Sequence, residues 1–208
     1  MAGVNLNMSQ ALSTKPKINW PDNQEYFLTS TTFLHYPYFK SSEQKELVLN
    51  KIKQIKKVFN VLILAYSIAL NHFHLKFYLH DGKLMSKIKI LLHSGISREY
   101  KEKYRVSYKV FWQSSKTLYI KDEEASWKIT GYIIGNLLKH REVNSFEELK
   151  NNPFSSYKYT AEKFGDALAE NLVYNVINTD ESPQCEINIG QLSKIELPPI
   201  AQPPSWTA

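Results

Sequence analysis

The sequence predicts an α+β fold: a ferredoxin-like antiparallel sheet with helices packed against one face. Two observations carry this prediction. Apolar residues recur at spacings that indicate the order strand, helix, strand, strand, helix, strand, helix. Hydrophobic residues make up 43% of the 208 residues and charged residues 22%, a balance typical of a globular chain with a sizeable core.

The first half of the chain supplies three expected strands and one helix. Residues 26–33 are aromatic and β-branched, as in a strand. Ser41 and Gln44 form a capping box in front of a helix over 42–59. Two apolar strands over 61–70 and 72–79 follow, with Asn71 between them and a turn at Asp81-Gly82 after the second.

The second half continues with a basic helix from about residue 83, which Ser94-Gly95 could end or bend. A strand is expected over 110–120. Asp122 then caps a helix that runs to about His140, and acidic residues follow the cap, where they suit the helix dipole. A short helix over 146–150 ends before Pro153.

Composition divides the chain into three regions. Residues 1–24 are polar and form a flexible lead, and residues 25–165 hold all the expected strands and helices. Residues 166–208 form a C-terminal extension. It is proline-rich after about residue 180, since five of the nine prolines lie in the last 26 residues, and no core of its own is expected there.

The cellular compartment is expected to be the cytoplasm. Cys185 is the single cysteine, so no internal disulfide can form and a reducing compartment is indicated. The first residues lack the charged and apolar regions of a signal peptide. The longest apolar stretch, 61–70, is too short to span a bilayer, so we expect no membrane association.

Positive charge gathers in one segment. The chain has a formal net charge of +6, and residues 83–109 alone hold eight basic residues against two acidic ones. The eight are Lys83, Lys87, Lys89, Arg98, Lys101, Lys103, Arg105 and Lys109. Tyrosines interleave with these cations, a pattern that suits a phosphate backbone with unstacked bases nearby. The alternative is an ordinary solvated helix face.

His72 and His74 flank Phe73 on the third expected strand. Residues i and i+2 of a strand point to the same face, so both imidazoles can reach one metal ion. Phe73 would then point the other way, into the core. The alternative is a pair of surface histidines with ordinary hydrogen-bond partners.

Tyr132 and Asn136 stand at i and i+4 on the helix that follows Asp122, so both project from one face. A tyrosine can act as a covalent nucleophile, and an amide oxygen can complete a site for a hard metal ion. The alternative is a tyrosine that only fills the core. Gly131 and Gly135 flank this face, and they either permit close approach of another backbone or are merely tolerated.

Four motifs in order resemble the single-tyrosine HUH transposases. Residues 65–75 (AYSIALNHFHL) resemble the family's "AYVLMPNHVHLL", and residues 111–113 (FWQ) resemble its "LWQ". Residues 129–139 (ITGYIIGNLLK) resemble "IIRYIHENPVK". Residues 153–157 (PFSSY) resemble the "PWSSY" that closes the domain in the REP-associated tyrosine transposase branch.

The resemblance implies a catalytic tyrosine on a late helix. Tyr132 would be the nucleophile, and His72, His74 and Asn136 would bind a divalent metal, Mg²⁺ or Mn²⁺. The implied activity is cleavage and rejoining of single-stranded DNA through a 5′-phosphotyrosine link, at sites flanked by hairpins. The DNA-binding residues that we expect are the basic set above together with Trp112 and Lys116.

The chain departs from the family pattern at three places. Leu70 and Leu137 stand where the family has proline, and Ser114-Ser115-Lys116 replaces a stretch that usually holds an arginine. Three other functions stay open: a domesticated protein that binds hairpin DNA without cutting it, a metal-dependent phosphodiesterase that uses water, and a scaffold with no site. A monomer is slightly favoured over a dimer that exchanges the tyrosine helix.

Overall fold

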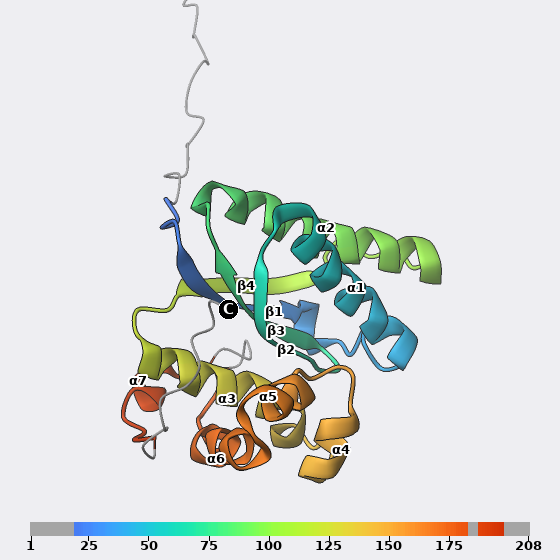
Figure 1. Cartoon of the computed structure of the whole chain (residues 1–208). Coiled ribbons are helices and arrows are strands. Elements are labelled where there is room, and N and C mark those ends of the chain that lie inside the picture. The colour runs from blue at the N-terminus through green and yellow to red at the C-terminus, as the bar shows by residue number, and fades with distance from the viewer. Residues whose placement is uncertain (1–18, 183–186, 198–208) are drawn as a thin grey trace, which may run out of the picture.

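A computed structural model describes residues 19–182 and 187–197 (Figure 1). Its centre is a four-stranded antiparallel sheet in the order β2-β3-β1-β4. The strands are β1 (Gln24–Thr32), β2 (Leu62–Ile68), β3 (His72–Leu79) and β4 (Trp112–Tyr119). Helix α1 (Ser42–Phe59) connects β1 to β2, and α2 (Met85–Tyr104) connects β3 to β4. This topology confirms the α+β, ferredoxin-like prediction.

Helices cover both faces of the sheet, rather than the one face expected. On β1, Thr29 contacts His74 of β3 on one side, whereas Ser30 contacts His93 of α2 on the other. Helix α1 packs alongside α2. The opposite face is covered by α3 (Glu123–Lys139), which packs on β2 and β3 (Figure 1). The physical reason is that β3 is buried on both faces, so that each set of alternate side chains needs a helix.

Capping residues set the helix boundaries much as expected. The Ser41–Gln44 capping box begins α1, and the Asp122 carboxylate accepts a hydrogen bond from the Ala125 amide at 2.8 Å to begin α3. Helix α2 runs through Ser94-Gly95 without interruption and stops at Arg105, which has a left-handed backbone. Tertiary burial of Ile96 and Tyr100 beyond the glycine stabilises this continuation.

The chain after α3 folds back against it. Short helices α4 (Phe146–Asn151), α5 (Tyr157–Phe164), α6 (Asp166–Val176) and α7 (Ile189–Leu192) surround the side of α3 away from the sheet (Figure 1). Two 3₁₀ turns, η1 (Phe33–His35) and η2 (Gly82–Leu84), complete the described elements. The side chains of Ile187 and Leu192 are buried in the core, although no core was expected this far along the chain.

Two glycines allow α6 to approach α3 closely. A Cβ atom on Gly131 would lie 2.5 Å from the carbonyl oxygen of Leu172, and one on Gly135 would lie 2.6 Å from Cγ1 of Val173. The close approach anticipated for these glycines is therefore present, and its partner is α6. Residues just past 165, where the C-terminal extension was expected to begin, thus support α3 directly.

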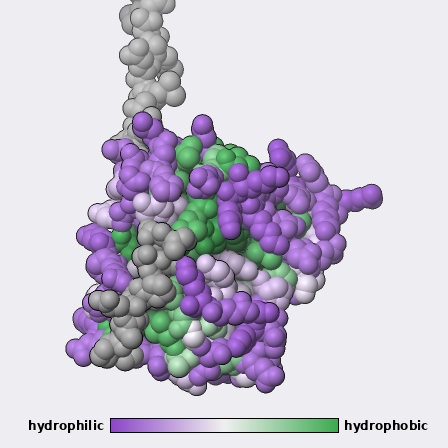
Figure 2. Space-filling model, in the orientation of Figure 1, coloured by the Kyte–Doolittle hydropathy of each residue, from purple (hydrophilic) through white to green (hydrophobic). Residues whose placement is uncertain are grey.

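Figure 2 shows hydrophilic residues over the periphery of one face and hydrophobic residues gathered toward its middle. Within residues 19–182 and 187–197, no helix is both long enough and apolar enough to cross a bilayer.

We predict that Gly131→Ala lowers the free energy of unfolding by about 2 kcal/mol, because the new methyl group meets backbone that cannot move aside. Gly135→Ala should lower it less, since a valine side chain can shift. Gly95→Ala is the control: its methyl group has room, and helix propensity should raise stability by about 1 kcal/mol. Thermal melting checks the order; equal effects at the three glycines would contradict it.

We predict acid sensitivity from His93, whose pKa burial lowers to about 4, with a smaller effect of Lys89 in the same direction. The unfolded chain takes up this proton near pH 6.5 and the folded chain does not, so stability falls as the pH drops through this window. Between pH 6.5 and 5 the loss is about 2 kcal/mol. Urea melts of wild type and His93→Gln should diverge by this amount, and parallel pH profiles would refute the prediction.

Candidate metal and nucleophile site

The structure brings together the four side chains that the sequence singled out. His72 and His74 project from the same face of β3, and Tyr132 and Asn136 project toward them from α3. Nε2 of His72 lies 3.1 Å from Oδ1 of Asn136. Nε2 of His74 lies 3.3 Å from Oη of Tyr132. None of the four residues is more than 2% exposed.

Lys76 makes a third set of contacts between β3 and α3. Its side chain follows His72 and His74 on the same strand face and is fully buried. The ammonium donates hydrogen bonds to the carbonyl oxygen of Ser126 at 3.1 Å and to Oγ1 of Thr130 at 3.0 Å, both on α3. It also forms a 3.0 Å ion pair with Glu25 of β1. Burial lowers the pKa of Lys76 to about 8, and Glu25 opposes this shift.

His72 has more oxygen neighbours than a neutral imidazole can satisfy. Nδ1 lies 2.8 Å from Oδ1 of Asn71, and Nε2 faces Oδ1 of Asn136. Burial, together with the nearby His140, lowers the pKa of His72 to about 3, so the ring carries only one N–H. One of the two contacts therefore sets a nitrogen lone pair against an oxygen lone pair. The amide nitrogen of Asn136 is also buried without a hydrogen-bond partner.

These residues fit a divalent cation. If the Nδ1–H group of His72 donates to Asn71, then Nε2 and the Asn136 oxygen are both left as lone-pair donors that face one another. His74 repeats the arrangement, because its Nδ1 lies 2.9 Å from the Thr29 hydroxyl, which leaves Nε2 toward the site. Burial also holds the pKa of His74 well below its usual range, so both rings are in the neutral form that binds metals. In the part of the chain that the structure describes, no three His, Cys, Asp or Glu side chains form a metal-binding group. The third protein ligand of the set is therefore the amide oxygen of Asn136.

Two further residues belong to the site and were not anticipated from the sequence. The Tyr132 hydroxyl donates a hydrogen bond to Oε1 of Glu181 at 2.8 Å. The other oxygen of Glu181 lies 3.4 Å from Nε2 of His140, whose ring centroid is 4.8 Å from that of His72. Burial raises the pKa of Glu181, but contacts with His140 and Tyr132 outweigh it and bring the pKa to about 2. The ionised carboxylate therefore covers the tyrosine hydroxyl.

His140 could have been found from its spacing, since it follows Asn136 by four residues and so continues the same helix face. Glu181 carries no comparable signal. It lies in the C-terminal extension, 49 positions after Tyr132, and only the return of the chain past α6 brings it to the site.

The basic segment 83–109 lies mainly on the other side of the sheet from this site, because α2 covers the opposite face. With 100° of rotation per residue, Lys87, Arg98 and Lys101 lie within an arc of about 60° around the axis of α2, on its solvent-facing side. Lys89 is half-buried, and Lys103 pairs with Glu43 at 2.8 Å. Three more expected residues, Lys83, Arg105 and Lys109, are exposed outside α2. The cations thus do not form a single stripe.

The two expected DNA-binding residues of β4 point to different faces. The indole N–H of Trp112 donates to the carbonyl oxygen of His93 at 2.9 Å, so this ring belongs to the α2 side. Lys116 pairs with Thr29 across the strands, which places it on the same face as His74. It is exposed and stands on the edge strand. Of the expected DNA-binding cations, Lys116 alone can be placed on the site's face from the strand pairing.

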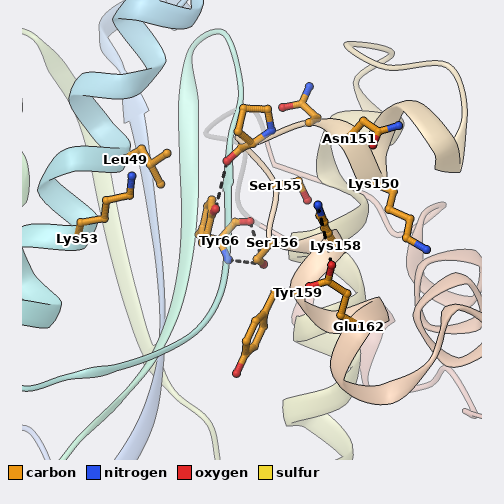
Figure 3. A pocket seen from close by; sticks show the side chains of 12 residues that line it. Leu49, Lys53, Tyr66, Lys150, Asn151, Ser155, Ser156, Lys158, Tyr159 and Glu162 are labelled. Carbon is orange, nitrogen blue, oxygen red and sulfur yellow. Dashed lines mark hydrogen bonds and ion pairs between the residues drawn. The ribbon is translucent and has the colours of Figure 1, made fainter.

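The Pro153–Tyr157 segment ties α3 to the opposite edge strand, β2. Oη of Tyr66 donates to the carbonyl oxygen of Pro153 at 3.1 Å, and the Tyr66 amide donates to Oγ of Ser156 at 2.9 Å (Figure 3). The Ser155 hydroxyl donates to the carbonyl oxygen of Ile134 on α3 at 2.9 Å. The segment also forms one wall of a cavity of about 420 Å³ between α1 and α5.

A solved structure with the same fold is a REP-associated tyrosine transposase bound to a REP hairpin. The two chains superpose with a TM-score of 0.57 and 17% sequence identity, over 72% of this chain and 86% of the other. This chain has the fold of that transposase. A candidate transposase from Deinococcus radiodurans R1 superposes with a TM-score of 0.43 and 15% identity, over 57% of this chain and 95% of the other. No protein-family model and no curated protein matches the sequence.

We predict that Lys76→Met lowers the free energy of unfolding by about 3 kcal/mol, because it leaves the Glu25 carboxylate half-buried without its cation. Adding Glu25→Gln should restore part of this loss, since the double variant buries no unpaired charge. Denaturant melts of the wild type, both single variants and the double variant form the cycle. Losses that simply add would show that the two side chains do not interact.

Proposed function

We propose that the chain cleaves and rejoins single-stranded DNA through a covalent 5′-phosphotyrosine link at Tyr132. The observation that carries the proposal is the convergence of Tyr132 with His72, His74 and Asn136 in one buried cluster. A tyrosine hydroxyl beside two neutral imidazoles and an amide oxygen suits nucleophilic attack on a phosphate. The shared fold with a transposase bound to a hairpin supports hairpin-flanked DNA as the substrate class.

In the proposed reaction the Tyr132 oxygen bonds to phosphorus and the bond from phosphorus to the 3′ oxygen breaks. The phenolic hydrogen already points at Glu181, so this carboxylate is the first acceptor for the proton. The released 3′ oxygen takes up one proton, which leaves a free 3′-hydroxyl group. The phosphodiester energy is kept in the link to tyrosine, and the reverse attack by a 3′-hydroxyl rejoins the strand.

His72, His74 and Asn136 are proposed to hold Mg²⁺ or Mn²⁺. Such an ion would polarise the scissile phosphate and offset its negative charge. The protein's own part is to keep both imidazoles neutral by burial and to fix their orientation. Asn71 and Thr29 provide that orientation through the Nδ1 atoms.

The partner is proposed to be single-stranded or hairpin DNA, bound by a monomer. Lys116 stands on the site's face of the edge strand, where it can meet a phosphate next to the one that is cut. The exposed cations of α2 would bind more distant duplex or flanking strand. A monomer is favoured because α3 packs on its own sheet and on α6 of the same chain, with backbone contact at Gly131.

A hairpin-binding protein with little or no cleavage is the second candidate. The observation in its favour is that Tyr132 is buried, with its hydroxyl bonded to Glu181. A phosphate reaches the hydroxyl only after the segment that carries Glu181 opens, and the cleavage proposal requires the carboxylate to stay within reach of the Tyr132 proton when it does. Formation of a covalent adduct separates the two functions.

We predict that the wild type, incubated with labelled hairpin DNA and Mn²⁺, forms an adduct that survives a denaturing gel. Tyr132→Phe should bind the DNA but form no adduct, because only the nucleophilic oxygen is removed. Tyr157→Phe, at another buried tyrosine, is the matched control and should react like the wild type. His72→Ala should lose both the adduct and Mn²⁺ affinity, whereas Asn136→Ala should be milder because water can replace an amide oxygen.

An adduct formed by Tyr132→Phe would assign the chemistry to another of the 13 tyrosines. Wild-type protein that binds the hairpin without forming an adduct would favour the second candidate. Wild-type protein that cleaves the DNA without becoming attached to it would indicate hydrolysis by water.

A further inference from the structure

The loop between β1 and α1 presents large apolar side chains to solvent. Phe33 is 40% exposed, Leu34 74% and Tyr36 55%. Leu34 and His35 both have left-handed backbones, with φ angles of 51° and 53°. Residues with side chains rarely adopt this conformation, and two in succession store backbone strain. Backbone strain in a loop that exposes apolar side chains indicates that a partner covers this apolar tip of the loop.

Hydrogen bonds from three elements hold the loop in this conformation. The Leu34 amide donates to Oε1 of Gln113 at 2.9 Å. The Thr32 hydroxyl donates to the carbonyl oxygen of Tyr36 at 2.7 Å. Nδ2 of Asn71 donates to the carbonyl oxygen of His35 at 3.2 Å. The apolar tip is thus a fixed surface, formed before any partner arrives.

Asn71 connects this loop directly to the candidate site. Its amide nitrogen binds the His35 carbonyl, while its amide oxygen lies 2.8 Å from Nδ1 of His72. One short side chain therefore spans from the loop backbone to a proposed metal ligand. A DNA strand that covers the loop can therefore run on toward the site.

The aromatic neighbours indicate which chemistry would cover the loop. Tyr36 is the exposed end of a row of rings: its centroid is 4.6 Å from that of Tyr38, which stacks on Phe111 at 4.5 Å. A flat apolar ligand can extend such a row by stacking, and nucleobases have this shape. Single-stranded DNA carries unpaired bases of this kind together with the phosphates that the site would bind.

We propose that the loop of residues 33–36 is a nucleobase-binding wedge, in which Tyr36 stacks on an unpaired base of the strand that reaches the site and Leu34 packs against the edge of that base. The inference rests on the proposed function, because it takes its ligand from the DNA strand that Tyr132 would cut. It adds a base-contacting surface to a site that otherwise touches only phosphate. The wedge would hold the strand unstacked at that point.

The test uses a hairpin oligonucleotide whose single-stranded flank contains 2-aminopurine, a base that loses fluorescence when it stacks on an aromatic ring. Leu34→Asn removes the apolar side chain and places there a residue that tolerates a left-handed backbone. It should melt no lower than the wild type, yet bind the flank about fivefold or more weakly. Val58→Asn is the matched control, because Val58 is also exposed, at 56%, but lies on α1, away from the proposed DNA contacts.

Tyr36→Ala is the second variant. Its backbone is not left-handed, with a φ angle of −61°, so the substitution adds no backbone strain. It should weaken binding by a similar factor and abolish the fluorescence loss that the wild type produces. Tyr174→Ala, at a tyrosine 62% exposed on α6, is its control. If Leu34→Asn has a lower melting temperature than the wild type, the test of the wedge rests on Tyr36→Ala alone.

The outcomes separate this proposal from the proposed function. If the wild type binds the oligonucleotide and forms the adduct but the loop variants behave like their controls, the wedge is wrong and the cleavage proposal stands. If the loop variants lose affinity and quenching while the controls do not, the wedge is supported. A wild type that binds no DNA overturns both.

Discussion

The buried ammonium of Lys76 is the constraint on which the arrangement of the site depends. A lysine charge without solvent must keep its partners, and these lie on two elements: Glu25 on β1, and Ser126 and Thr130 on α3. Helix α3 cannot slide along the sheet without breaking these contacts. Two residues of a strand span about 6.6 Å and four residues of a helix about 6 Å. Alternate residues of β3 and every fourth residue of α3 are therefore spaced almost equally. The spacing from Tyr132 to Asn136 thus matches that from His74 to His72, and the two pairs meet when Ser126 and Thr130 are fixed on Lys76.

Support for α3 comes also from the side away from the sheet. Helix α6 packs against it closely enough that Gly131 and Gly135 have no room for a side chain. Ser155 fastens the middle of α3 to the segment that binds the edge strand β2. The tyrosine is thus held between a charged contact on one side and a close backbone contact on the other. Reactive groups held in this way keep their geometry when a flexible strand binds.

Much of this arrangement follows from local pattern. Alternation along β3 places His72 and His74 on one face, and helical spacing pairs Tyr132 with Asn136, so each half of the cluster could be predicted from the sequence. The face of the sheet that α3 covers could not, because that choice depends on burial of β3 from both sides. Lys76 lies between the apolar residues Leu75 and Phe77, a signal that becomes interpretable only when its partners Glu25 and Ser126 are known. Glu181 reaches the site only through the tertiary fold, so no local pattern in the sequence predicts it.

Native-state hydrogen exchange of Lys76→Met tests whether this buried charge holds α3 in its position on the sheet. We expect that amides of residues 126–136 lose protection, while those of α1 and α2 on the opposite face keep the protection of the wild type. The reason is that the variant removes only contacts between β3, β1 and α3. An equal loss of protection in all three helices would show that Lys76 stabilises the fold as a whole and does not position the tyrosine helix.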